Sequence, residues 1–208
     1  TTDMDGQLLS RTVEIRPLGV IFNSGDELHF KVWNKYDRIR LRETGNSKGY
    51  NIFGSTFIPL GPYDWWYTEM NYTGSSKRKV YAYANTNWGN YYDGDRTYYN
   101  GGITWKAGSR YAISADMTYN DIDVEGDRFI TREVGSRLSA DFSTRLSSSV
   151  FVQYNNQSHE VLTNFRLHYI PRIGSDLYIV YNHLLDEEFD YRTKRTTGVI
   201  KLNYTYRL

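Results

Sequence analysis

The chain has 208 residues, of which 25 are Lys or Arg and 24 are Asp or Glu, giving a formal net charge of +1. This balance, with both signs mixed along the chain, excludes the basic footprint of a nucleic-acid-binding protein. The sequence has no Cys, which excludes disulfides and thiolate metal sites, and no run of about 18 apolar residues that would form a membrane-spanning helix.

Strands dominate the predicted elements. The 20 Tyr, 9 Phe and 5 Trp suit a pleated surface, and apolar residues alternate with polar ones in segment after segment, as Leu28, Phe30 and Val32 do. Period-two alternation indicates strands with one apolar and one polar face. The predicted strands are 10–22, 26–36, 63–73, 78–88, 96–106, 110–120, 129–143, 148–156, 160–171, 175–184 and 196–208. We predict one all-β, antiparallel region over residues 1–208.

The predicted connections alternate in length along the chain. The compact ones are 23–25, 74–77, 107–109, 144–147 and 172–174, and between them lie the longer segments 37–62, 89–95, 121–128 and 185–195, with 157–159 as a short exception. Short turns at one end and long loops at the other are typical of outer-membrane β-barrels, whose short turns are periplasmic. A polar lumen and hydrophilic loops explain why such a chain has low mean hydropathy.

The last eleven residues, Gly198 to Leu208, continue the alternation to the end of the sequence. Ile200, Leu202 and Tyr204 share one face with Tyr206 and Leu208, as in the closing strand of a barrel. Eleven strands that end in the periplasm are odd in number, whereas single-chain bacterial barrels are even-stranded. We therefore expect the C-terminal part of a larger transmembrane barrel. The N-terminus lacks the features of a signal peptide, so we expect that an exported chain has been processed or truncated there.

Several short stretches carry a family resemblance. The most specific runs from Arg166 to Asn182, and weaker ones are Tyr91–Arg96, Val152–Asn155 and Lys201–Leu208. From about Tyr67 onward the chain resembles bacterial outer-membrane proteins that have an N-terminal carbohydrate-binding family-9-like domain and a C-terminal barrel, although it ends in Leu208 where an aromatic residue is commoner. The resemblance implies architecture and location. It places carbohydrate binding in an upstream domain and assigns no catalytic residue.

Possible metal and catalytic residues are scattered. The loop from Asp121 to Asp127 resembles an oxygen-ligand calcium loop but lacks the spacing of an EF-hand, and two further acidic stretches, Asp93–Asp95 and Asp186–Glu188, are interpreted as solvated loops. The four histidines, His29, His159, His168 and His183, have no metal-ligand spacing. No nucleophile motif accompanies them. We therefore assign no catalytic, cofactor-binding or metal-binding residue and expect a non-enzymatic protein without a cofactor.

The predicted inward face carries charges of both signs. Either these charged side chains line a pore with little charge selectivity, or they pair across strands and fill the lumen. These residues are Glu14, Arg16, Glu27, Lys31, Lys35, Asp116, Arg137, Asp141, Arg166, Lys201 and Arg207. Aromatic clusters at predicted strand ends are interpreted as an interface girdle, with sugar stacking by Trp88 or Tyr91 as the alternative. These clusters are Trp65–Tyr67, Tyr81 with Tyr83, Trp88, Tyr91–Tyr92 and Tyr98–Tyr99.

The sequence thus predicts an outer-membrane β-barrel that acts as a pore or as the membrane anchor of an envelope assembly. Its expected partners are outer-membrane lipid and lipopolysaccharide, the upstream part of the same protein and other envelope proteins, with no nucleic acid. Two alternatives stay open. One is a surface glycan-binding or glycan-processing protein whose active domain lies upstream, and the other is a soluble β-sandwich binding module.

Overall fold

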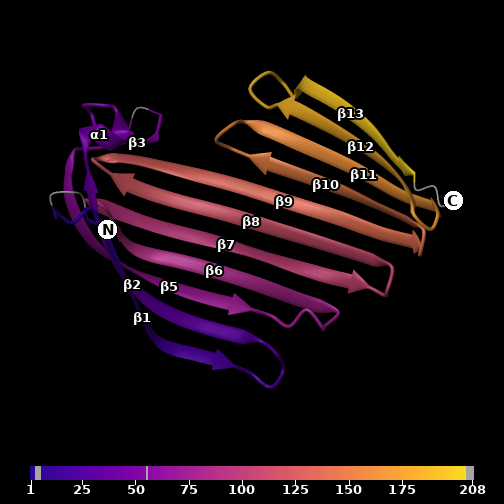
Figure 1. Cartoon of the computed structure of the whole chain (residues 1–208), viewed down its shortest axis with the longest axis horizontal. Coiled ribbons are helices and arrows are strands. Elements are labelled where there is room, and N and C mark those ends of the chain that lie inside the picture. Colours follow the sequence, from indigo (N-terminus) through magenta and orange to yellow (C-terminus); the bar gives the residue numbers. More distant parts are fainter. Residues whose placement is uncertain (3–5, 55, 205–208) are drawn as a thin grey trace. The chain divides into compact units, whose positions relative to one another are not determined.

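The computed structural model describes residues 1–2, 6–54 and 56–204. It confirms the all-β prediction, because 11 strands form one antiparallel sheet in the order β1-β2-β5-β6-β7-β8-β9-β10-β11-β12-β13 (Figure 1). The strands are β1 (Ser10–Ile21), β2 (Glu27–Ile39), β5 (Gly61–Thr73), β6 (Val80–Tyr91), β7 (Gly94–Ala107), β8 (Tyr111–Val124), β9 (Asp127–Ser143), β10 (Leu146–Asn155), β11 (Glu160–Arg172), β12 (Ser175–Asp186) and β13 (Arg192–Tyr204).

Strands that follow one another in this sheet order also follow one another along the chain, as in a β-meander or an up-and-down barrel. Among the described residues, β1 pairs only with β2, and β13 pairs only with β12. Closure into a barrel therefore stays a prediction. The predicted strand 196–208 begins four residues earlier, at Arg192, and its last four positions, 205–208, lie outside the described residues.

The predicted alternation of loop length is largely wrong. Strand β6 ends at Tyr91 and β7 begins at Gly94, so the expected loop 89–95 is a turn of two residues, and β8 and β9 are joined by Glu125 and Gly126 alone. Glu125 has φ 53° and Gly126 has φ 78°, the positive values that a tight type I′ hairpin requires. The expected loop 185–195 shortens to residues 187–191. The strands extend into these expected loops because backbone hydrogen bonds between strands do not require apolar side chains.

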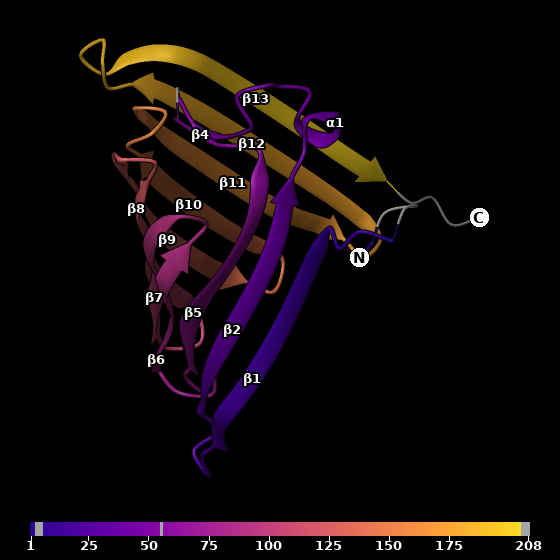
Figure 2. The same cartoon turned by 90° about the vertical axis from the view of Figure 1, so that its left-hand side faces the viewer.

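The segment 40–60 is the exception, since it is long as predicted but folded. It contains the one-turn helix α1 (Leu41–Thr44) and a small hairpin formed by β3 (Tyr50–Phe53) and β4 (Thr56–Ile58). Figure 2 shows α1 beyond the end of β2. Ile58 of β4 is fully buried and packs with Ile39, Ile122 and Val124. This cluster joins the folded segment to the ends of β2 and β8.

The internal packing of the chain divides it into two units, which we describe separately. Unit 1 comprises residues 1–75, 83–100 and 119–130, and unit 2 comprises residues 76–82, 101–118 and 131–208. Unit 1 contains the folded segment 40–60 and the cluster around Ile58. Unit 2 contains β10 to β13, which pair antiparallel, with a register shift between Tyr169 and Arg172 of β11 and another between Leu184 and Leu185 of β12.

Within each unit the strands have two different faces. In unit 1, Lys31 pairs with Glu69 and Lys35 with Trp65 on one face, while Val13 pairs with Asn34, and Ile15 with Val32, on the other. We call these the charged face and the apolar face. In unit 2 the charged face carries Arg137, Asp141, Arg166 and Lys201, and the apolar face carries Val134, Leu138, Val152, Tyr181, Ile200 and Leu202.

The apolar faces are open to solvent. Trp66 is 50% exposed and Ile15 49% in unit 1, and Leu138 is 47% exposed and Ile200 73% in unit 2. In unit 1 the charged face is more enclosed, since the side chains of Lys31 and Glu69 are each only 17% exposed. In unit 2 the charged residues Arg137, Asp141, Arg166 and Lys201 are themselves exposed. The distribution in unit 1 is the reverse of that in a water-soluble sheet, which buries its apolar face.

Candidate functional site

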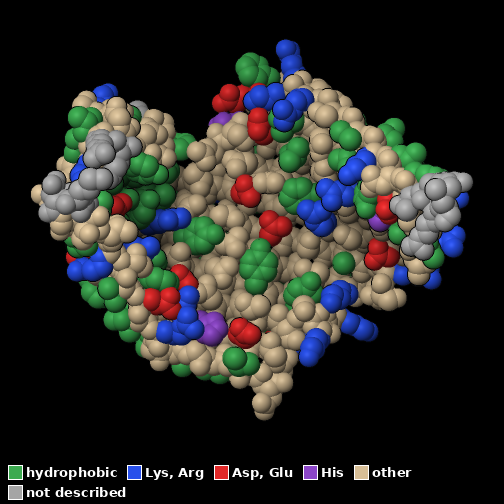
Figure 3. Space-filling view, viewed as in Figure 1, with side chains coloured by type: hydrophobic (Ala, Val, Ile, Leu, Met, Phe, Trp, Pro, Cys, Tyr) green, Lys and Arg blue, Asp and Glu red, His purple; other side chains and the backbone are tan. Residues whose placement is uncertain are grey.

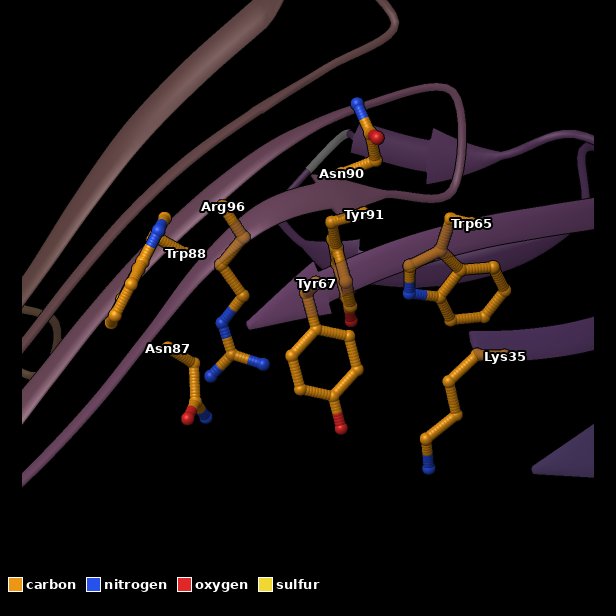
Figure 4. Close-up of a pocket in the computed structure, with 8 residues that line it drawn as sticks. All are labelled: Lys35, Trp65, Tyr67, Asn87, Trp88, Asn90, Tyr91 and Arg96. Atoms are coloured by element: carbon orange, nitrogen blue, oxygen red, sulfur yellow. The ribbon is translucent and has the colours of Figure 1, made fainter. Parts of the chain in front are cut away.

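A cavity of about 170 Å³ lies on the charged face of unit 1. Strands β2, β5, β6 and β7 supply its lining, which consists of Lys35, Trp65, Tyr67, Asn87, Trp88, Asn90, Tyr91 and Arg96 (Figure 4). Figure 4 shows the side chains of Lys35, Tyr67 and Arg96 extending in the same direction, with Tyr67 between the two cations, whereas Asn90 points away. Trp88 and Asn90 are themselves exposed and form the border of the cavity.

Strand register brings these residues together. Lys35 of β2 lies opposite Trp65 of β5, and Tyr67, two residues further along β5, lies opposite Gly89 of β6. Residues two apart on a strand share a face, so Asn87 and Tyr91 of β6 lie on the same side as Tyr67. A Cβ on Gly89 would lie 2.7 Å from the Cα of Tyr67, and Gly89 has φ +138°. Glycine is therefore required where β6 approaches β5.

Ring contacts fix the aromatic side chains of the cavity. Trp65 is 7% exposed, its ring centroid lies 4.6 Å from that of Tyr92 and 6.3 Å from that of Tyr91, and Tyr91 and Tyr92 meet edge to face at 4.9 Å. Tyr67 stacks on Trp33 with an interplanar angle of 12°. These contacts hold the rings before any ligand arrives.

Two cations border the rings. The guanidinium of Arg96 donates from Nε and Nη2 to Oδ1 of Asn120, at 3.1 and 2.7 Å, and lies 5.4 Å from the ring centroid of Tyr91. The ammonium of Lys35 lies 5.7 Å from the ring centroid of Trp33. Across the part of the chain that the structure describes, neither side chain has an ion pair with a carboxylate within 4.0 Å. The cavity therefore has a local positive charge.

The acidic groups near the cavity already have partners. Glu69 accepts hydrogen bonds from Lys31 and from Nε1 of Trp33, each at 3.1 Å, and also from Asn71. Asp95 accepts from Asn90 at 3.1 Å. Neither carboxylate is directed to Lys35 or Arg96. Cross-strand pairing, one of the two interpretations of the charged face, is thus confirmed for Lys31 with Glu69 but does not extend to Lys35. Figure 3 shows acidic and basic side chains interspersed with hydrophobic ones.

The turns next to the cavity contain a second group of ionisable side chains. The hydroxyl of Tyr92 donates to Oδ2 of Asp37 at 3.3 Å, and burial, together with the nearby Tyr91 and Asp37, raises the pKa of Tyr92. A hydrogen bond with the carboxyl group of Asp93 raises the pKa of Glu125. Asp93 of the β6–β7 turn therefore influences the titration of Glu125 in the β8–β9 turn.

The acidic stretch 121–127, considered as a calcium loop, belongs mainly to strands. Asp121 forms a bidentate pair with Arg128, with Nη2 and Nε at 2.6 and 2.9 Å from the two carboxylate oxygens. Among residues 1–2, 6–54 and 56–204, no group of three or more His, Cys, Asp or Glu side chains is arranged to hold a metal ion. Asp121 thus serves as an ion-pair partner in the structure.

The four histidines have different polar neighbours. His29 is 3.6 Å from Glu27, and His168 contacts Asp176 at 2.9 Å and stacks on Tyr178. His159 lies 3.5 Å from Glu187, and Nδ1 of His183 lies 3.0 Å from the hydroxyl of Thr196. Each histidine therefore has a polar neighbour within its own part of the sheet.

The aromatic residues that the sequence assigns to an interface girdle divide into two groups. Trp65, Tyr91 and Tyr92 pack against one another on the charged face, so the girdle interpretation is wrong for them. Trp66, Trp88 and Tyr99 are 50%, 40% and 47% exposed, and the girdle stays a prediction for them. Tyr91 lines the cavity, as the sugar-stacking alternative requires, whereas Trp88 only borders it. Arg96 and Asn87 were not predicted as parts of a site.

Comparisons with known proteins add no functional assignment. No protein-family model matches the sequence, and the searches of curated proteins and of solved structures found no match. In the described residues, no helix combines the length and the apolar character needed to cross a bilayer. The site is therefore defined by its geometry alone.

Proposed function

We propose that the chain forms part of the wall of an outer-membrane β-barrel and acts as a pore or as the membrane anchor of an envelope assembly. The observation that carries the proposal is the solvent-exposed apolar face, which both units have. A contiguous apolar surface on a soluble monomer seldom exceeds a few hundred Å². Exposed side chains such as Ile15, Trp66, Leu138 and Ile200 suit contact with lipid hydrocarbon.

Two further features support this proposal. The 11 strands are ordered as an up-and-down meander, the order of strands in outer-membrane barrels. The opposite, charged face carries ion pairs and hydrogen bonds between strands, such as Lys31 with Glu69 and Asn164 with Asn182, which suit a polar lumen. The proposed partners are accordingly outer-membrane lipid and lipopolysaccharide.

A matched pair of arginine substitutions on β9 tests the proposal. Leu138 is 47% exposed on the apolar face, and Ser139 follows it on the charged face. In a bilayer, Leu138→Arg should lower the free energy of unfolding by about 2–4 kcal/mol, whereas Ser139→Arg should change it little. On a soluble sheet an exposed substitution such as Leu138→Arg stays within about 0.5 kcal/mol. Urea unfolding from lipid vesicles measures both variants.

Two simpler measurements accompany this pair. A barrel requires detergent for extraction and migrates differently on a gel before and after boiling. A chain that stays monomeric in buffer without detergent would contradict the proposal and favour a soluble binding module. For inserted protein, stable ohmic steps in a planar bilayer support the pore, and the absence of steps supports the anchor.

A further inference from the structure

The cavity between β2, β5, β6 and β7 has the properties of a binding site for a small cyclic anion. Its volume of about 170 Å³ is comparable to that of engineered cavities of about 150 Å³ that hold a six-membered ring. Trp65, Tyr67 and Tyr91 supply ring faces, and Lys35 and Arg96 supply positive charge. All five residues belong to unit 1, so the site is complete within one unit.

The charge of the cavity determines the class of ligand. Lys31 and Lys35 lie on the same face of β2, but within the described part of the chain Lys31 alone has a carboxylate partner, Glu69. The guanidinium of Arg96 bonds to the neutral amide of Asn120. Two cations that lack an acidic partner favour a ligand that brings its own negative charge, because charge-assisted hydrogen bonds are the strong ones.

The neutral part of the lining determines the rest of the ligand. The ring faces of Tyr67 and Tyr91 suit the apolar face of a sugar ring, and the amide of Asn87 offers both a donor and an acceptor for hydroxyl groups. The hydroxyls of the two tyrosines add further hydrogen-bonding groups. A purely aromatic acid would leave these polar groups unpaired, which disfavours its binding.

We propose that this cavity binds an acidic monosaccharide of the hexuronate class. The sugar ring lies against Tyr67 and Tyr91, the carboxylate lies on the side of the cavity toward which Lys35 and Arg96 extend, and a ring hydroxyl bonds to Asn87. In a barrel with an open lumen such a site selects anionic sugars. Binding itself does not require insertion in a membrane, so this inference and the proposed function can fail independently.

Calorimetric titration of the whole chain in detergent, with D-glucuronate, D-glucose and benzoate as probes, tests this assignment. Glucuronate should bind at least about tenfold more tightly than glucose, since it alone adds a charge-assisted bond to a sugar ring. Raising the salt concentration from about 0.05 to 0.5 M should weaken the binding of glucuronate and leave the binding of glucose unchanged. Equal affinities for glucuronate and glucose, binding of benzoate in preference to glucuronate, or no binding of any probe would overturn the proposal.

Variants of the two cations locate the site. Lys35→Met and Arg96→Met should each weaken glucuronate by about tenfold or more, and Lys35→Arg should retain most of the affinity because it keeps the charge. Lys77→Met is the matched control, since Lys77 is exposed in the segment between β5 and β6 and does not belong to the lining of the cavity. Circular dichroism and gel mobility show whether each variant folds. Unchanged affinity in a folded Lys35→Met variant would overturn the assignment.

Discussion

The hydroxyl of Thr56 donates a hydrogen bond of 2.9 Å to Oδ2 of Asp127, joining two residues that are 71 positions apart. Thr56 begins β4 and Asp127 begins β9, so this bond connects the folded segment 40–60 to the β8–β9 hairpin. The rings of Phe53 and Phe129 stack beside it at 4.8 Å. Segment 40–60 is therefore attached to the sheet by a hydrogen bond as well as by the cluster around Ile58.

Thr56→Val should loosen this segment without unfolding the sheet. The substitution keeps the shape of the side chain but removes the donor to Asp127, which costs about 1 kcal/mol for a buried bond. Local opening should then become about fivefold more frequent. The rate of trypsin cleavage after the exposed residue Lys48 measures how often the segment opens. Thr144→Val, at an exposed position in the β9–β10 turn, is the control, and equal cleavage of both variants would refute the attachment.

Gly94→Ala should destabilise the fold through a steric clash. A Cβ at Gly94 would lie 1.8 Å from the carbonyl oxygen of Asp123, so β7 and β8 would have to separate at that end. Forcing extra atoms into a packed site costs about 1–3 kcal/mol. The control is Gly198→Ala, where a Cβ would meet nothing within 4 Å. The midpoint of urea unfolding should fall for Gly94→Ala alone, and a wild-type midpoint would show that the two strands separate without cost.

The carboxyl pair of Glu125 and Asp93 should make the turns next to the cavity more stable in acid. The hydrogen bond from Asp93, followed by desolvation, raises the pKa of Glu125 above its ordinary value of 4.5. The folded state then holds a proton that the unfolded state has lost, so stability falls as pH rises from 4.5 through the raised pKa. Glu125→Gln keeps a hydrogen-bonding group but does not titrate, and the wild type should lose stability relative to it over this window.

Two measurements check this pH dependence. Carboxyl ¹³C chemical shifts give the pKa of Glu125 directly, and urea midpoints of the wild type and of Glu125→Gln, compared at each pH, isolate its effect from that of other groups. A pKa of Glu125 at or below 4.5 would contradict the carboxyl pair. Parallel pH profiles of the two proteins would show that the pair does not affect stability.

Much of the sheet could be predicted because its strands have two unlike faces. Leu28, Phe30 and Val32 alternate with charged or polar residues, and this pattern predicted β2 within three residues at its far end. The prediction failed where the alternation of apolar and polar residues stops although the strands remain paired. Tyr91 and Tyr92 are both aromatic, and 121–127 is mostly acidic, so these segments were interpreted as loops although β6 and β8 run into them.

The candidate site was less predictable than the sheet. Tyr91 was identified as a residue for sugar stacking, and Lys35 as an inward-facing charge, but nothing in the sequence connected them. Their proximity depends on the register of two strand pairs, β2 with β5 and β5 with β6, which alternation leaves undetermined. Lys31 has a carboxylate partner in the described structure and Lys35 does not. This difference depends on the position of Glu69, which is 38 residues from Lys31 along the chain.

Lys31 and Glu69 should stabilise the charged face mainly through their interaction with each other, rather than through independent contributions of the two residues. Both side chains are 17% exposed, and Glu69 also accepts from Nε1 of Trp33. Glu69→Ala leaves the ammonium of Lys31 and the indole N–H without their acceptor, which should lower the free energy of unfolding by about 1–3 kcal/mol. Lys31→Met, Glu69→Ala and the double variant complete a mutant cycle.

The double variant should be less destabilised than the sum of the two single variants, because removing both charges leaves no enclosed charge unpaired, although the indole N–H of Trp33 still lacks its acceptor. Urea unfolding of the four proteins gives the coupling free energy. Glu27→Ala is the control on the same face of β2, since Glu27 is 49% exposed and lies 3.6 Å from His29. Additive effects in the cycle would show that water solvates Lys31 and Glu69 separately, as in a wide aqueous lumen, whereas strong coupling indicates a charged face from which bulk water is largely excluded.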